Sequence, residues 1–289
     1  MNKTLSFSYL ISVYSPVIIA LTETWLDEHL PTSAIELSGY NVFRKDRRGK
    51  GGGVLLAVKN CYKCSPLPDS PVDELEIVGC NVLLHSITVR IVVSYLPDGS
   101  DLGMGKKLFN KLSTLCGHKY NYISVGDFNL PLVDCDKELF PAHGNYLEFE
   151  KFYMRLQPAA QLVKVPTRTD SVLDLCFTNS PYLLSSPTVL PPIDGSDHNV
   201  LLFPLNTHVF YNKPVQTYNY LNTKLLTTLI SSQKIEQLEK AFLQKASLSQ
   251  YENIRILLSD IVHKCASQKR CVAKVIVFWI KGQKRFTTE

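Results

Sequence analysis

Residues 122–129 read Tyr-Ile-Ser-Val-Gly-Asp-Phe-Asn: four residues typical of a strand, then a glycine, an acid, an aromatic and an amide. The first four predict a buried strand, and the glycine permits a sharp turn at its end. Asp127 and Asn129 are two residues apart, so an extended backbone puts both on one side and Phe128 on the other, toward the core. We therefore expect a carboxylate and an amide together at a strand end, where α/β folds place chemistry. An ordinary Asx turn is the alternative.

Two other predicted strands are also followed by polar side chains. Residues 17–21 form a continuous apolar run, typical of a buried strand, and Glu23 comes just after it. A carboxylate at the tip of a buried strand is a good ligand for a hard metal ion, and an acid in the first turn of a helix is the alternative. Tyr95 closes a second predicted strand, residues 87–93, where its hydroxyl could bind a phosphate or its ring could simply pack.

A third predicted strand, residues 172–177, carries an acid in its middle, Asp174. A charge inside an apolar strand is costly unless it is paired, so Asp174 should have a partner. His198, which precedes the predicted strand 200–205, is the natural one, because a carboxylate fixes the tautomer and orientation of an imidazole.

A basic, glycine-rich loop is predicted between the strands at residues 40–44 and 54–58. It contains Arg44, Arg47, Arg48 and Lys50 and ends in three glycines. Such a loop can approach a phosphate backbone closely. It lacks the Gly-Lys-Ser/Thr of a nucleotide-binding P-loop, and a solvated hairpin loop is the alternative.

Helical periodicity predicts helices at residues 4–15, 104–116 and 145–157. The first is predicted from the spacing of Leu5, Tyr9, Leu10 and Val13. Residues 221–265 also show apolar stripes at helical spacing, so the C-terminal segment is expected to be helical.

The charge of the chain is unevenly distributed. The 289 residues are 45% hydrophobic and 20% charged, as in ordinary soluble globular proteins. Residues 206–289 contain 13 Lys and Arg against 5 Asp and Glu, a net charge of +8, whereas residues 1–205 carry −3. A basic segment suits a polyanion such as nucleic acid, and a solvated helical face is the alternative.

Neither a membrane span nor a secretory signal is expected. No apolar stretch reaches the roughly 18 residues that a membrane span needs. Several serines and Pro16 interrupt the apolar residues 5–21. Of eight cysteines, Cys61 and Cys64 form the one close pair, without the second pair that a structural zinc site needs. Reduced thiols indicate an intracellular protein.

The motifs together resemble the endonuclease/exonuclease/phosphatase superfamily. More narrowly, residues 2–205 resemble the apurinic-type endonuclease domain of non-LTR (LINE-like) retrotransposons. The resemblance lies in the order and spacing of Thr22-Glu23-Thr24-Trp25, residues 44–54, Gly126-Asp127-Phe128-Asn129, Pro166-Thr167-Arg168, Leu173-Asp174 and Ser196-Asp197-His198. It implies a four-layered α/β sandwich at residues 1–205, two packed mixed β-sheets flanked by helices. A basic helical linker at residues 206–289 would follow as an α-helical extension.

The resemblance also implies roles for residues. Glu23 would bind Mg²⁺ or Mn²⁺, with Asp197 beside it, and no small-molecule cofactor is expected. Asp127 would position or deprotonate the attacking water, and Asn129 and Tyr95 would hold the scissile phosphate. His198, oriented by Asp174, would stabilise the developing charge or act as the base. DNA would be the partner, in the nucleus, contacted by Arg44, Arg47, Arg48, Lys50 and Arg168.

The sequence departs from the family at its start. In the family the chain begins with a strand that carries an Asn at the active-site end, and Met1 falls just after that strand. We therefore expect unpaired backbone in the sheet, marginal stability and weak activity. The chain also stops before any reverse transcriptase motif, a region that would belong to the full-length element. A catalytically impaired relic that keeps nucleic-acid binding is one alternative function, and a phosphatase of the same superfamily is another.

Overall fold

The structure is a computed structural model. It describes residues 3–206 except 28, 36, 50, 69–73, 85 and 194, together with residues 220–221, 266–267 and 273–279. Two compact units divide the chain: Met1–Phe210 with Val272–Glu289, and Tyr211–Cys271. In the second unit, β12 (Tyr220–Leu221) pairs antiparallel with β13 (Ala266–Ser267). The expected helices at residues 222–265 lie outside the described residues, and the expected boundary at residue 205 stays a prediction.

The first large sheet has six strands in the order β10-β11-β14-β1-β3-β2. Its buried centre is formed by apolar runs, as in β1 and β3, where nearly every side chain is buried. The strands are β1 (Ile18–Thr22), β2 (Tyr40–Lys45), β3 (Val54–Lys59), β10 (Thr188–Leu190), β11 (Val200–Leu205) and β14 (Ala273–Trp279).

The second sheet has the order β4-β5-β6-β7-β9-β8. Its central pair is parallel, β6 with β7, and its other pairs are antiparallel. The strands are β4 (Cys64–Pro66), β5 (Glu76–Leu84), β6 (Ile87–Tyr95), β7 (Asn121–Asp127), β8 (Ala160–Gln161) and β9 (Asp174–Thr178).

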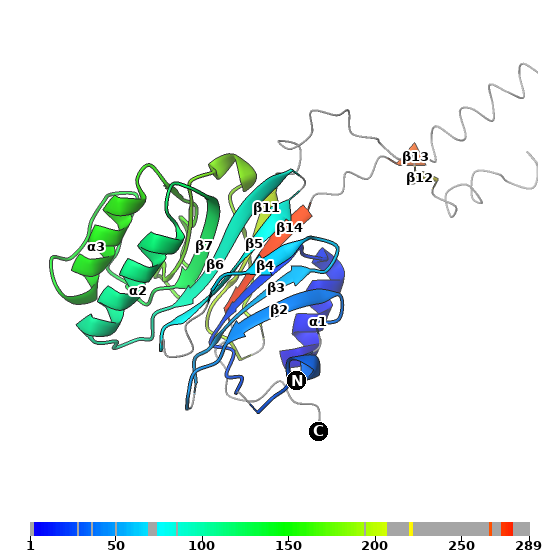
Figure 1. The fold of residues 1–289 in the computed structure, drawn as a ribbon, viewed down its shortest axis with the longest axis horizontal. Coiled ribbons are helices and arrows are strands. Elements are labelled where there is room, and N and C mark those ends of the chain that lie inside the picture. The colour runs from blue at the N-terminus through cyan, green and yellow to red at the C-terminus, as the bar shows by residue number, and fades with distance from the viewer. Residues whose placement is uncertain are drawn as a thin grey trace, which may run out of the picture. The chain divides into compact units, whose positions relative to one another are not determined.

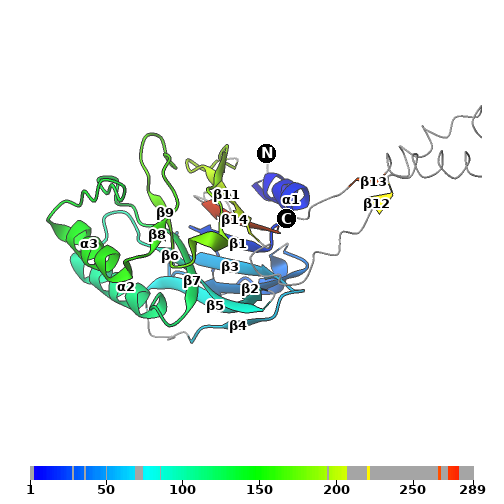
Figure 2. The ribbon, with the colours of Figure 1, turned by 90° about the horizontal axis from the view of Figure 1, so that it is seen from above.

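The two sheets pack face to face, and helices cover their outer faces, which confirms the expected four-layered sandwich (Figures 1 and 2). Helix α1 (Lys3–Tyr14) covers the first sheet, where Phe7 joins a cluster with Ile19 and Leu55. Helices α2 (Leu102–Leu115) and α3 (Gly144–Leu156) cover the second sheet. Short 3₁₀ turns lie at Thr32–Ala34 and Pro181–Leu183.

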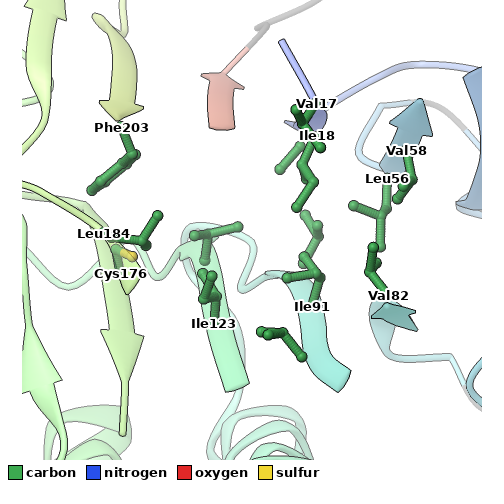
Figure 3. Packing of buried hydrophobic residues seen from close by; sticks show 14 of the residues in the cluster. Val17, Ile18, Leu56, Val58, Val82, Ile91, Ile123, Cys176, Leu184 and Phe203 are labelled. Carbon is green, nitrogen blue, oxygen red and sulfur yellow. The ribbon is translucent and has the colours of Figure 1, made fainter. Parts of the chain in front are cut away.

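The core between the sheets consists mainly of branched aliphatic side chains. Figure 3 shows Ile18 and Leu56 of the first sheet opposite Ile91 and Val82 of the second, and all four are almost fully buried. Burying each such side chain contributes about 1.5–3 kcal/mol. This packing fixes the sheets relative to each other, and therefore also the residues that follow their strands.

Helix α1 exists as expected, but only some of its apolar side chains face the sheet. Tyr9 and Val13 are 66% and 51% exposed, whereas Phe7 is buried and Leu10 and Ile11 pack partly against the sheet. Tyr9 and Val13 are four residues apart, so they share one face of the helix, and that face is turned to solvent.

Strand β14 was not expected. Its residues lie in the segment predicted to be helical, yet they form a strand that pairs parallel with β1 and antiparallel with β11. The three consecutive β-branched residues Val275-Ile276-Val277 suit a strand better than a helix. We expected unpaired backbone in this sheet, but β1 is bonded on both sides, by β14 and β3. Among the described residues, no helix combines the length and the apolar character that crossing a membrane requires.

Candidate active site

The end of β7 presents Asp127, which is 2% exposed. Its Oδ1 accepts a hydrogen bond from the Asn129 backbone N–H at 3.0 Å, so the alternative Asx turn is present as well as the carboxylate. Phe128 points the other way, into an aromatic cluster with Phe109 and Phe177, as expected.

The turn falls at Asn129 rather than at the glycine. Asn129 has φ of 46°, and its Nδ2 donates to the Leu96 carbonyl oxygen at 3.0 Å. Gly126 lies within the strand, and a Cβ there would collide with the Ser94 carbonyl oxygen on the neighbouring strand. The glycine therefore permits a close approach of two backbones and does not make the turn that we expected.

Asp174 and His198 form the expected acid–histidine pair. The His198 Nδ1 lies 2.9 Å from Asp174 Oδ2, and both side chains are buried. On the other side of the ring, Nε2 lies 4.0 Å from Asp127 Oδ2, which is too far for a hydrogen bond. The ring therefore stands between two carboxylates, with its Nδ1 held by one of them.

Asp174 lies at the start of β9, not in the middle of a strand as expected. The Thr167 hydroxyl accepts hydrogen bonds from the backbone N–H groups of both Leu173 and Asp174, at the point where β9 begins. Asp174 is therefore the residue directly opposite Asp127 on β7. The sequence could not give this register, because it depends on where the preceding loop folds back.

The pKa values of both aspartates are raised. Burial raises the pKa of Asp127 well above its usual range, and the nearby carboxylate of Asp174 raises it further. Burial also raises the pKa of Asp174, while its bond to His198 and the charge of that ring oppose the shift. Two buried acids side by side are a costly arrangement, which is typical of functional sites.

Glu23, which follows β1 of the first sheet, meets Tyr95, the last residue of β6 in the second sheet and the register partner of Asp127. Glu23 follows β1 with φ of 50°, and its Oε1 accepts a hydrogen bond from the Tyr95 hydroxyl at 2.6 Å. Burial and then this bond raise the pKa of Tyr95, so the phenol stays neutral. The charge of Glu23 also contributes to the raised pKa of Asp127.

The glycine-rich loop is anchored inside the protein by Glu76, which is 5% exposed. Glu76 accepts hydrogen bonds from the Gly53 backbone N–H and from Arg47 Nε. The Arg47 guanidinium lies over the Tyr95 ring, 5.6 Å from its centroid. A side chain at Gly52 would clash with Arg47 and Glu76, and one at Gly53 with the Thr24 hydroxyl, so the glycines allow the loop to pack against the site.

The expected nucleic-acid contacts differ in their accessibility. Arg44 donates to the carbonyl oxygens of Asp27 and Leu30 and pairs with Asp46 at 3.3 Å, so it serves the loop structure. Arg47 is likewise paired, as described, whereas Arg48 is exposed. Lys50 lies outside the described residues.

Asp197 and Arg168 form an ion pair at 2.7 Å beside the buried cluster. Asp197 is largely exposed although His198 next to it is buried, so the two neighbours face different ways. Arg168 lies close enough to lower the pKa of both buried aspartates.

Three residues with a part in the site were not predicted. Glu76 shows no sequence signal, because its bonds depend on a loop that meets it only after folding, and Thr167 enters the prediction only as part of a motif. Trp25 was noticed only as part of a motif. It has φ of 55°, is 37% exposed and donates its backbone N–H to the Gly52 carbonyl oxygen.

The buried cluster has the donor set of a cation site. Asp127, Asp174 and His198 each offer one ligand atom, and these atoms lie within 4.8 Å of one another. Two adjacent carboxylates with raised pKa values would be relieved by a divalent cation, and Glu23 adds a third carboxylate close to Asp127. Carboxylate oxygens are the ligands that Mg²⁺ and Mn²⁺ prefer, so the residues fit such an ion.

In a comparison with protein families, the endonuclease/exonuclease/phosphatase family matches residues 2–198. A comparison with curated proteins found no match.

Solved structures share the fold at low sequence identity. The endonuclease domain of TRAS1, a telomere-specific non-LTR retrotransposon, is 16% identical with a TM-score of 0.54, covering 73% of this chain and 94% of that domain. An AP endonuclease from Archaeoglobus fulgidus is 16% identical with a TM-score of 0.52, covering 68% and 92%. The 3′ phosphatase NExo from Neisseria, bound to a product DNA hairpin, is 17% identical with a TM-score of 0.52, covering 68% and 91%.

Proposed function

Because this chain belongs to the endonuclease/exonuclease/phosphatase family, we propose that it is a metal-dependent phosphodiester hydrolase that nicks DNA. One observation carries the proposal: His198 is held by Asp174 at 2.9 Å and faces Asp127 at 4.0 Å, with all three side chains buried. An imidazole oriented by one acid and placed beside another is suited to proton transfer and charge stabilisation at one point.

Each residue then has a defined task. Asp127 accepts the proton of the attacking water, since its raised pKa makes it a better base than an exposed aspartate. His198 donates from Nε2 to the phosphate oxygens as charge develops on them, because Asp174 already holds Nδ1. The Tyr95 hydroxyl holds Glu23 and, with Asn129, lies where the phosphate would be bound.

The metal ion would be held by Glu23, and Mg²⁺ or Mn²⁺ bound there would neutralise charge on the phosphate. Neither Asp197 nor Arg168 is needed for this. Their ion pair would instead border the site and present Arg168 to a DNA strand.

Two features support DNA as the substrate. The net charge of +8 at residues 206–289 would give affinity that is independent of sequence and falls with salt. Near Glu23, the exposed ring of Trp25 and the exposed Arg48 could contact a base and a phosphate. As the specific form of this function we propose a retrotransposon-type nicking role, in the nucleus and beside a reverse transcriptase; the fold shared with the TRAS1 endonuclease domain supports the nicking alone.

The test is nicking of supercoiled plasmid by the full chain, with Mg²⁺, with Mn²⁺ and with EDTA. We expect nicking with either ion, and a loss of about 10²–10⁴-fold in His198→Ala. The matched control is His118→Ala, because His118 is exposed, and it should nick at the wild-type rate.

Other outcomes separate the alternatives. No nicking with either ion, together with salt-dependent DNA binding, would identify the impaired form. Release of phosphate from a 3′-phosphorylated duplex without plasmid nicking would identify a phosphatase.

A further inference from the structure

Strand β14 joins two parts of the first sheet that are not otherwise bonded to each other. Its register runs from Ile18↔Val275 to Thr22↔Trp279 on β1, and from Leu201↔Val277 to Leu205↔Ala273 on β11. It therefore lies in the middle of a six-stranded sheet, between strands from the opposite ends of the family domain (Figure 2).

The same strand separates the two halves of the candidate site. Glu23 directly follows β1, and Trp279 at the end of β14 is opposite Thr22. His198 precedes β11 by two residues, and Leu201 on that strand pairs with Val277. Consequently β1, which precedes Glu23, and β11, which follows His198, are kept apart by β14, which lies between them.

Geometry gives the consequence of removing β14. Neighbouring strands lie about 4.8 Å apart, so β1 and β11 are separated by roughly two spacings and cannot bond to each other where they stand. Without β14, β1 and β11 would either leave unpaired backbone in the middle of the sheet or move toward each other by one strand spacing. Closure would move Glu23 relative to His198 by several ångströms, far more than a site tolerates.

We propose that residues 273–279 are a docking strand, which binds between β1 and β11 and sets the spacing of the two halves of the site. The segment between β11 and β14 contains a compact unit of its own, Tyr211–Cys271, so the docking strand reaches its place through a long connection. Such a connection adds little closure cost as it lengthens. The strand is therefore held by its hydrogen bonds to β1 and β11 and not by its connection to the rest of the chain. The slot between β1 and β11 is a binding site for one strand. The claim about the site rests on the proposed function; the claim about docking does not.

The first test is Val277→Pro in the full chain. Since β14 is bonded on both sides, each of its N–H groups faces a partner strand, and proline removes one such bond. We expect the melting temperature to fall by about 6–12 °C. Amides of residues 18–22 and 200–205 should lose hydrogen-exchange protection, while residues 121–127 in the other sheet keep it. The control is Thr287→Pro, which lies outside the strand residues 273–279. Unchanged protection of 18–22 and 200–205 would overturn the proposal.

A second test applies even if that variant does not fold. A specific protease site is placed at residues 240–246 and cleaved in the native protein. We expect the two pieces to elute together, and an excess of a synthetic peptide of residues 270–283 to displace the C-terminal piece. Pieces that separate while 18–22 stay protected would refute docking.

Nicking distinguishes the two claims. If the uncleaved protein nicks and Val277→Pro does not, while its second sheet stays protected, the strand also positions the site. If the unaltered protein does not nick, the proposed function fails, and the exchange and elution results still decide whether the strand docks.

Discussion

Asp127→Asn should make the protein more stable and less active. Asp127 and Asp174 offer oxygens within 4.8 Å of each other and are both fully buried. At an effective dielectric constant of about 20, two charges at that distance repel by roughly 3 kcal/mol, and His198 offsets part of it. Asparagine is nearly isosteric and can still accept the hydrogen bond of Asn129, so no cavity term opposes the gain. We expect the free energy of unfolding to rise by about 1–3 kcal/mol and the melting temperature by about 2–12 °C.

The gain should depend on pH in a defined direction. Because the pKa of Asp127 is raised in the folded state, that state binds more protons than the unfolded chain, so this group's contribution to stability falls as pH rises above its unfolded pKa near 3.8. The advantage of Asp127→Asn should therefore be small at acid pH and grow toward neutral pH. Nicking should fall by about 10²–10⁴-fold.

Thermal melts in EDTA between pH 4 and pH 8 measure the difference in melting temperature between Asp127→Asn and the unaltered protein. The control is Asp134→Asn: hydrogen bonds from Lys137 lower the pKa of that exposed carboxyl, so its removal should not stabilise. A variant of Asp127 that melts below the unaltered protein, or an advantage that does not change with pH, would refute the reasoning.

Two further variants probe the ends of neighbouring strands. Tyr95→Phe removes the hydrogen-bond donor to Glu23, so it should lower nicking by about 10²-fold and the free energy of unfolding by about 1–2 kcal/mol. The control Tyr182→Phe, at an exposed tyrosine, should change neither. Equal nicking by both variants would contradict the role of the Tyr95 phenol. Gly126→Ala should cost about 1–3 kcal/mol in urea unfolding, because its Cβ would meet a neighbouring backbone oxygen; Gly117→Ala, which meets no atom closer than 3.6 Å, is the neutral control.

Much of the fold could be predicted from local sequence patterns. The apolar runs that became β1, β3 and β11 are long enough, and β-branched enough, to specify buried strands wherever the chain places them. The pairing of Asp174 with His198 was also predictable, because a buried charge requires a partner and few were available.

Errors arose where periodicity does not say which side is covered. In α1, the apolar spacing gave the helix but not its buried face, since Tyr9 and Val13 form a second apolar stripe that no sheet covers. The glycine of the central motif has the local pattern of a turn residue, because the neighbouring strand that requires it is distant in sequence.

The sequence by itself determined the strands, the acids at their ends and the acid–histidine pair, because these follow from local backbone preference and from the cost of unpaired charge. Tertiary structure alone decided that Asp127 and Asp174 are opposite in register, and that Glu76 holds the basic loop against Tyr95. It also decided that residues 273–279 lie between β1 and β11. Those contacts join segments far apart in the chain, so their free energy depends on partners that no local pattern specifies.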